Sequence, residues 1–212
     1  MRAALFSTYS FWILTGYLSG SILYGYLIPR IFHHVDVTSA SDDGNPGTAN
    51  AFKYAGFRAG CTVIVCELLK SFVPVFLAAR SVEPTRLPFA FVMAAPVAGH
   101  AFSFFFKGKG GKAIAASFGV MLALFPELFP FAALAFFYIL FSTVIVISPH
   151  LYRSIITFIF FTAAVCLKIP VHALRLGCGM ISCITVSKHV MAYKQETLSV
   201  HLFRHERPNG QL

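Results

Sequence analysis

Residues 87–125 read LPFAFVMAAPVAGHAFSFFF-KGKGGK-AIAASFGVMLALF, two apolar runs separated by a turn of lysines and glycines. A helix needs ~20 apolar residues to cross the hydrocarbon core of a bilayer. The first run has that length, and the second is shorter. Lysines confined to the turn indicate that it lies at a membrane surface, because charged residues are excluded from the bilayer core. This stretch therefore predicts two membrane helices joined by a basic loop.

The composition of the whole chain also predicts a membrane protein. The 212 residues are 57% hydrophobic and only 12% charged, and the mean hydropathy is +0.73. These values exclude an ordinary soluble domain. We predict an all-α fold, a polytopic bundle of about seven transmembrane helices that forms a single domain over residues 1–212. The expected spans are residues 4–28, 59–79, 87–106, 113–125, 131–147, 155–167 and 171–190.

The basic residues predict the orientation of this bundle. Eleven Lys and Arg residues fall on one face and four on the other, while Lys70 and Arg175 fall within spans. Positive residues collect on the cytoplasmic side. We therefore expect a multi-pass protein of the cell membrane with its N-terminus outside and its C-terminus in the cytoplasm. The net charge of +9 is explained by this topology and by attraction to anionic membrane lipids. The sequence lacks the basic stripe with interleaved aromatic residues that is typical of nucleic-acid binding, so we expect no nucleic-acid partner.

Polar groups inside the predicted spans are few. The five cysteines lie in apolar segments without a CxxC pair, which favours packing over a disulfide frame or a metal site. We expect neither a metal nor a cofactor. Glu67 and Lys70 share one helical face and can pair. They are either a structural ion pair or part of the wall of a site.

The lysine-glycine turn is a candidate phosphate site facing the cytoplasm. Gly110 and Gly111 allow backbone N–H groups to approach a ligand closely, and Lys109 and Lys112 supply positive charge. The turn leads into a predicted helix, whose N-terminus favours an anion. The alternative is a basic loop that only sets the topology. His100, about two turns upstream, is either a packed residue or a member of the site.

Residues 41–50, SDDGNPGTAN, form a second candidate loop on the same face. The loop has glycines that permit unusual backbone angles and neutral side chains that suit a polyol or phosphate. These residues are Gly44, Asn45, Gly47, Thr48 and Asn50. The adjacent carboxylates of Asp42 and Asp43 repel a dianion unless a cation intervenes, and they suit a base or a metal site better. The alternative is a plain Asn-Pro-Gly turn.

Four blocks in a fixed order resemble the PlsY family of membrane acyl-phosphate:glycerol-3-phosphate acyltransferases. The blocks are GSILYGYLI at 20–28, GNPGTAN at 44–50, GHAF at 99–102 and KGGK at 109–112. The resemblance implies transfer of an acyl group from acyl phosphate to the 1-hydroxyl of sn-glycerol 3-phosphate, giving lysophosphatidic acid without a cofactor. It implies catalytic roles for Asp43, Lys53 and Lys112. The implied substrate-binding residues are Gly44, Asn45, Gly47, Thr48, Asn50, His100, Lys109, Gly110 and Gly111.

The chain departs from the family pattern at several positions. Asp43 stands where the family usually has Ser, and Lys53 stands where it has Arg. Lys53 keeps the charge without the bidentate fork, and Asp43 could act as a base. The best alignment of the C-terminal motif places Lys194 and Thr197 at its His and Asn positions. Three functions therefore stay open: a divergent active acyltransferase, a non-catalytic membrane protein that binds lipid phosphate, or an acyltransferase that uses another acceptor.

Overall fold

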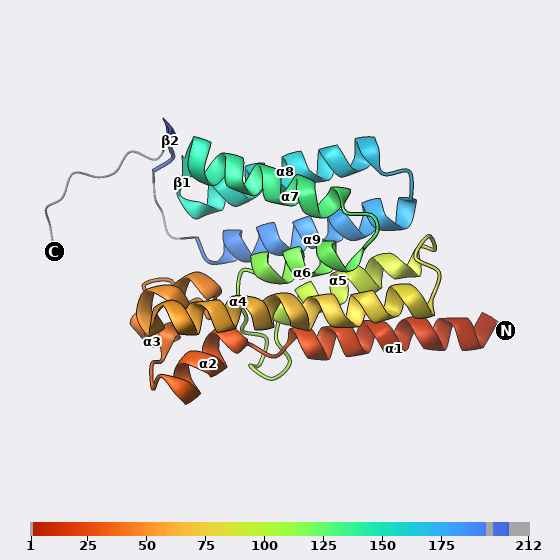
Figure 1. The fold of residues 1–212 in the computed structure, drawn as a ribbon, viewed down its shortest axis with the longest axis horizontal. Coiled ribbons are helices and arrows are strands. Elements are labelled where there is room, and N and C mark those ends of the chain that lie inside the picture. Colours follow the sequence, from red (N-terminus) through yellow and green to blue (C-terminus); the bar gives the residue numbers. More distant parts are fainter. Residues whose placement is uncertain (1, 194–196, 204–212) are drawn as a thin grey trace, which may run out of the picture.

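The computed structural model describes residues 2–193 and 197–203, and almost all of its elements are helices (Figure 1). Three apolar segments of this described part, Ser7–Phe32, Thr48–Ser81 and His150–Lys168, are long and apolar enough to cross a membrane. The elements follow in the order α1 (Arg2–Gly20), α2 (Tyr24–Phe32), α3 (Val37–Ala40), α4 (Thr48–Ser81), α5 (Pro88–Ala101), α6 (Ile114–Ala123), α7 (Phe129–Ile139), the π-helix η1 (Leu140–Val144), β1 (Ile145–Ser148), α8 (His150–Lys168), α9 (His172–Met191) and β2 (Ser199–Leu202).

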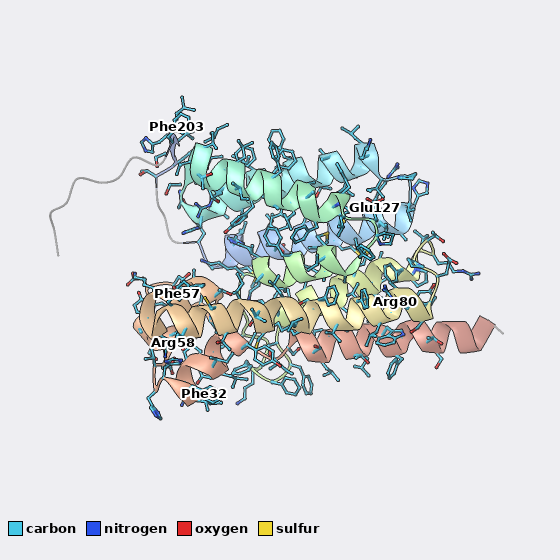
Figure 2. All side chains as sticks on the ribbon, viewed as in Figure 1. Phe32, Phe57, Arg58, Arg80, Glu127 and Phe203 are labelled. Atoms are coloured by element: carbon cyan, nitrogen blue, oxygen red, sulfur yellow. The ribbon has the colours of Figure 1, made fainter. Side chains whose placement is uncertain are left out.

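The long helices lie side by side, and the bundle has two distinct ends. The N-terminus of α1 lies at the end opposite to α3 (Figure 1). Phe57 and Arg58 lie at the α3 end, whereas Arg80 and Glu127 lie at the other end (Figure 2). α4 therefore extends through the length of the bundle, and the loop that joins α3 to α4 lies at one end.

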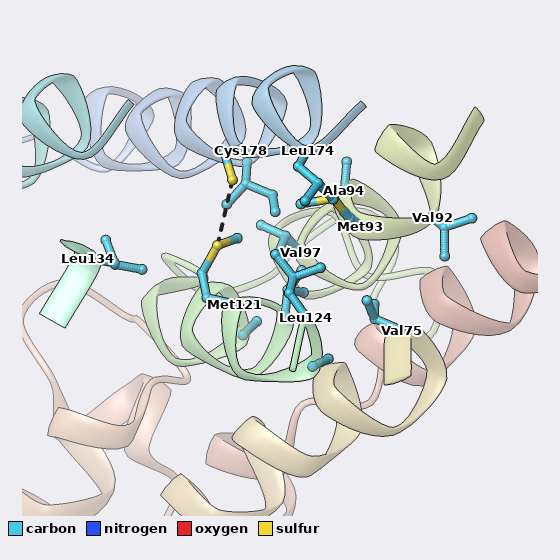
Figure 3. Packing of buried hydrophobic residues seen from close by; sticks show 14 of the residues in the cluster. Val75, Val92, Met93, Ala94, Val97, Met121, Leu124, Leu134, Leu174 and Cys178 are labelled. Carbon is cyan, nitrogen blue, oxygen red and sulfur yellow. Dashed lines mark hydrogen bonds between the residues drawn. The ribbon is translucent and has the colours of Figure 1, made fainter. Parts of the chain in front are cut away.

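Helix α5 lies at the centre and packs against α1, α4, α6 and α9. Its side chains Met93 and Val97 are fully buried. Beside them, Met121 of α6 and Cys178 of α9 meet, with Cys178 Sγ lying 3.7 Å from Met121 Sδ (Figure 3). A helix that packs against neighbours on most of its sides has no polar face, and His100 is the one polar side chain of α5. The packing of this core fixes the ends of α4, α5 and α6, from which the loops of the candidate site extend.

The predicted span 4–28 lies largely within the apolar segment Ser7–Phe32, but its helix is interrupted, because α1 ends at Gly20 and α2 begins at Tyr24. The helix backbone approaches α5 so closely here that a Cβ atom on Gly20 would lie 2.1 Å from the Pro96 carbonyl oxygen. The next carbonyl, that of Ser21, accepts a hydrogen bond from Ser103 Oγ at 2.6 Å. These tertiary contacts replace the helical hydrogen bonds at the break.

The predicted span 131–147 is wrong at its end, because its last residues are not helical. Helical structure stops at Val144, and residues 145–148 form β1, which pairs antiparallel with β2. The β-branched run Val144-Ile145-Val146-Ile147 favours an extended strand. The all-α prediction is therefore correct for the bundle and wrong at this edge. A further difference lies in α4, which begins at Thr48 and bends at Gly56 (φ 88°), so residues predicted as loop are helical.

Candidate active site

The loop at residues 41–47 is held in one arrangement by the side chains of Asp43 and of Asn50, which lies in the first turn of α4. Asp43 Oδ1 accepts hydrogen bonds from the Asn45 backbone N–H at 3.2 Å and from Asn50 Nδ2 at 2.9 Å. Asn50 Nδ2 also donates to the Asn45 carbonyl at 2.8 Å. The loop leads directly into α4 at Thr48, and the unpaired N–H groups of a helix N-terminus favour an anion. We call residues 41–47 the first loop.

The loop at residues 102–113, the second loop, packs tightly on the end of α5. The Gly111 N–H donates to the His100 carbonyl at 3.1 Å. A Cβ atom on Gly110 would lie 2.1 Å from the same oxygen, so a larger residue does not fit there without rearrangement. Ala113 adopts a left-handed conformation (φ 59°) immediately before α6 begins. This path brings Lys112 against the first loop.

A salt bridge joins the two loops, with Lys112 Nζ 2.7 Å from Asp43 Oδ2. Burial tends to raise the pKa of Asp43, but hydrogen bonds from Lys112 and Asn50, together with the charge of Lys112, outweigh it and lower the pKa to about 2. Asp43 is therefore a carboxylate throughout the physiological pH range. A carboxylate with so low a pKa is a weak proton acceptor. Its main effect in this structure is to hold Lys112 at the first loop.

Several cavities meet at this salt bridge, and Asp43 and Lys112 line each of the three that concern the site. The largest, which we call the apolar cavity, has a volume of about 320 Å³. It extends between α4, α6 and α7, where Ile64, Phe118 and Tyr138 form its wall. A hydrocarbon chain fits such a wall because it removes apolar surface from water.

Two smaller cavities lie on the other sides of the salt bridge. The basic cavity, of about 200 Å³, is lined by Gly44, Gly110 and Lys188, which offer backbone groups and a second cation. The polar cavity, of about 230 Å³, presents mainly hydrogen-bonding side chains. The residues that line this cavity and neither of the other two include Ser41, Asp42, Lys53, Tyr54 and Tyr193. One site thus offers apolar, polar and cationic surfaces to its ligands.

Two histidines that were not assigned to the site from the sequence line both the apolar and the polar cavity. They are His150, the first residue of α8, and His189, in the last turn of α9. His189 is buried, and its Nδ1 lies 2.9 Å from the Thr185 carbonyl oxygen. A carbonyl only accepts, so Nδ1 carries the proton and Nε2 of the neutral ring can accept one. The position of Lys188-His189 at the end of the last apolar run was the available signal.

Most of the residues predicted for binding lie at these cavities. His100 and Glu67 reach the apolar cavity, so Glu67 belongs both to a buried ion pair and to the wall of the site. Gly111 packs against the His100 ring. The remaining predicted residues at the apolar cavity are Asn45, Gly47, Thr48 and Asn50, and those at the basic cavity are Gly44, Asn45 and Gly110.

Other predicted residues are not drawn into the centre of the site. Lys53 lines the polar cavity, but its side chain is exposed and Nζ lies 4.9 Å from the centre of the Tyr54 ring. Lys109 is exposed and lines none of the three cavities. Thr197 is exposed, and Lys194 lies outside the described residues. Within residues 2–193 and 197–203, no group of three or more His, Cys, Asp or Glu side chains could hold a metal ion.

The fold and the cavities together define a class: a helical membrane protein with a site suited to a phosphate group attached to an apolar chain. A family profile described as glycerol-3-phosphate acyltransferase matches residues 10–198, and the chain belongs to this family. Relatives of that name are 36% identical in Myxococcus xanthus, over 124 residues, and in Streptococcus thermophilus, over 157 residues. These matches cover 58% and 72% of this chain and 64% and 66% of the relatives, slightly less than two thirds of their lengths.

Crystal structures of PlsY, described as an integral membrane glycerol 3-phosphate acyltransferase, share the fold. The glycerol 3-phosphate form matches with a TM-score of 0.73 and 26% sequence identity, over 86% of this chain and 88% of that chain. The lysophosphatidic acid form matches with a TM-score of 0.69 at the same identity, over 85% and 87% of the two chains. The resemblance to the PlsY family is therefore confirmed.

Proposed function

We propose that this protein transfers an acyl group from acyl phosphate to the 1-hydroxyl of sn-glycerol 3-phosphate, forming lysophosphatidic acid for phospholipid synthesis. The observation that carries the proposal is a wall shared by the apolar and polar cavities, formed by Asp43, Asn50, Lys112, His150 and His189. An acyl chain needs apolar surface, whereas glycerol and phosphate need hydrogen-bond donors. Because the two cavities adjoin at these residues, an acyl phosphate in one and glycerol 3-phosphate in the other would have their reacting groups close together.

Each cavity then takes one part of the substrates. The acyl chain lies against Phe118 and Tyr138 in the apolar cavity, and the glycerol hydroxyls lie in the polar cavity. Phosphate groups bind at Lys112 and in the basic cavity beside Lys188, where cations and the backbone of the glycine turn favour an anion. The closely packed glycine turn is needed here because side chains on Gly110 would push the second loop away from α5.

The reaction needs one proton acceptor and stabilisation of one leaving group. The hydroxyl oxygen attacks the carbonyl carbon of acyl phosphate and forms the ester bond. The bond from that carbon to the phosphate oxygen breaks, and phosphate leaves with the electron pair. His189 Nε2 accepts the hydroxyl proton, and Lys112 stabilises charge on the leaving phosphate. Acyl phosphate is already activated, so neither a covalent enzyme intermediate nor a cofactor enters these steps.

We also propose the predicted topology, with about seven spans, the N-terminus outside, and the C-terminus and the site in the cytoplasm. Its support is that Arg58 lies at the α3 end of the bundle and Arg80 at the opposite end (Figure 2). Eleven Lys and Arg residues are assigned to the face of Arg58 and four to the face of Arg80, although Lys194, Arg204 and Arg207 of the larger group lie outside the described residues. A C-terminal fluorescent protein fusion is expected to fluoresce. Activity of a C-terminal alkaline phosphatase fusion would contradict this orientation.

Product analysis tests the reaction itself. Purified protein in detergent is incubated with palmitoyl phosphate and glycerol 3-phosphate, and lysophosphatidic acid is measured by mass spectrometry. We expect the product only when both substrates are present. A panel of other phosphorylated polyols tests the acceptor, and a clear preference for one of them would replace glycerol 3-phosphate in the proposal. Binding of palmitoyl phosphate without any product would favour the non-catalytic alternative.

A further inference from the structure

A buried carboxylate, Glu67, lies behind both loops of the site, and the proposed reaction steps do not use it. Glu67 is 1% exposed, and its neighbours Lys70 and His100 are 5% and 4% exposed. Glu67 Oε2 lies 2.7 Å from Lys70 Nζ and 2.9 Å from His100 Nδ1. The three side chains come from α4 and α5 and form one polar cluster inside an apolar bundle. Ionisable groups in such a place are costly and commonly functional.

On one side, this cluster is connected to the first loop through the backbone between α1 and α2. Glu67 Oε1 accepts a hydrogen bond from the Gly25 N–H at 3.3 Å, and Lys70 Nζ donates to the Ile22 carbonyl at 2.6 Å. Both backbone groups belong to the segment where α1 breaks and α2 begins. Gly25 is in turn packed on the first loop, since a Cβ atom there would lie 2.2 Å from the Pro46 carbonyl oxygen. The first loop therefore rests on backbone that Glu67 and Lys70 hold.

On the other side, the cluster is connected to the second loop through His100. His100 presents Nδ1 to Glu67, and the opposite side of its ring faces Gly111 and Asn45. A Cβ atom on Gly111 would lie 2.3 Å from His100 Nε2 and 3.3 Å from Asn45 Oδ1. The His100 carbonyl also accepts the hydrogen bond from the Gly111 N–H. The ring thus lies where the first and second loops meet.

A buried ion pair adds little net stability compared with apolar side chains of similar size, because desolvation offsets the attraction. Its hydrogen bonds nevertheless fix the groups that they join. We propose that Glu67 is a positioning residue: through Gly25 and His100 it sets the two loops at the separation at which Lys112 reaches Asp43. The inference rests on the proposed function only for its effect on catalysis, since the loop contacts do not depend on the reaction.

The double variant Glu67→Leu/Lys70→Met tests this role. It removes both charges together and leaves no unpaired buried ion, so we expect it to unfold at a temperature close to that of the wild type. Hydrogen–deuterium exchange should become faster in the first loop and in residues 107–113 of the second loop, and stay unchanged in α8. Misplaced loops should lower kcat/KM on the order of 100-fold. The matched control Glu67→Asp keeps the charge and should retain the protection of both loops.

A second variant removes only the connection between the cluster and the second loop. His100→Leu should speed exchange in residues 107–113 and leave the Gly25 contact with the first loop in place. Unchanged exchange in the loops of both variants would overturn the inference, and so would faster exchange that includes α8. If the wild type lacks acyl transfer but the exchange pattern appears, the proposed reaction fails while the positioning role of Glu67 stands.

Discussion

Lys112 Nζ and Asp43 Oδ2, which are 69 residues apart in the chain, lie 2.7 Å from each other at the junction of three cavities. The contact engages the cation that the proposed reaction needs for phosphate. Charge-assisted hydrogen bonds are strong, and two anions at one lysine repel each other. A phosphate group that enters the site must therefore compete with Asp43 for Lys112.

Replacing Asp43 with Asn should strengthen phosphate binding. The amide keeps the shape of the carboxylate but removes its negative charge, so Lys112 becomes available to the ligand. We expect inorganic phosphate to inhibit Asp43→Asn at about tenfold lower concentration than the wild type, equivalent to ~1.4 kcal/mol. The control Asp42→Asn removes one charge from the same turn and should shift inhibition less. Weaker inhibition of Asp43→Asn than of the wild type would contradict the competition.

The salt bridge also predicts a pH dependence of stability. The pKa of Asp43 falls from its usual 3.8 to about 2 in the folded protein, so its contribution is fully present above about pH 4 and is lost as the pH falls toward 2. The difference in unfolding temperature between the wild type and Asp43→Asn should therefore be the same at pH 7 and pH 5. It should shrink at pH 3. A difference that already disappears at pH 5 would be inconsistent with the lowered pKa.

His189 is expected to act as the base. His189→Ala removes the proton acceptor at the shared wall, so kcat should fall by a factor of about 10² to 10⁴ while KM changes little. The matched control is His172→Ala, because His172 is exposed at the opposite end of the same helix. It should keep wild-type activity. Equal kinetics for the two variants would remove His189 from the mechanism and leave His150 as the remaining imidazole at the wall.

The apolar cavity should select the acyl chain. Phe118 lies edge-on to Tyr138, with ring centres 6.0 Å apart, and both line this cavity. Phe118→Trp narrows it, so KM for palmitoyl phosphate should rise about tenfold while KM for glycerol 3-phosphate stays the same. A donor with an eight-carbon chain should be affected less. An equal rise in KM for palmitoyl phosphate and glycerol 3-phosphate would show that the apolar cavity does not bind the acyl chain alone.

The bundle and its two loops could be predicted from the sequence because both signals are local. Apolar length indicates spans, and the lysines and glycines of residues 107–112 indicate a polar turn at their boundary. The break after Gly20 could not be predicted in the same way. It depends on the approach of Pro96 and on a hydrogen bond between Ser103 and Ser21, residues far apart in the chain.

The candidate site was predicted in part for the same reason. Asn45 and Lys112 stand out in glycine-rich segments, and the structure places both at the cavities. His189 lies in the last turn of an apolar helix, and only the packing of α9 beside the loops shows that its ring faces the site. Glu67 and Lys70 could be paired from their spacing. Their connection to Gly25 and through His100 to Gly111 needs the tertiary structure.

Phosphate release tests the central claim most directly. Purified protein is mixed with palmitoyl phosphate, glycerol 3-phosphate is then added, and inorganic phosphate is measured together with lysophosphatidic acid. The proposed reaction predicts one phosphate released for each lysophosphatidic acid formed, and a large loss of both in Lys112→Ala protein whose unfolding temperature shows that it is folded. Phosphate release that does not depend on glycerol 3-phosphate, or that equals the Lys112→Ala background, would contradict it.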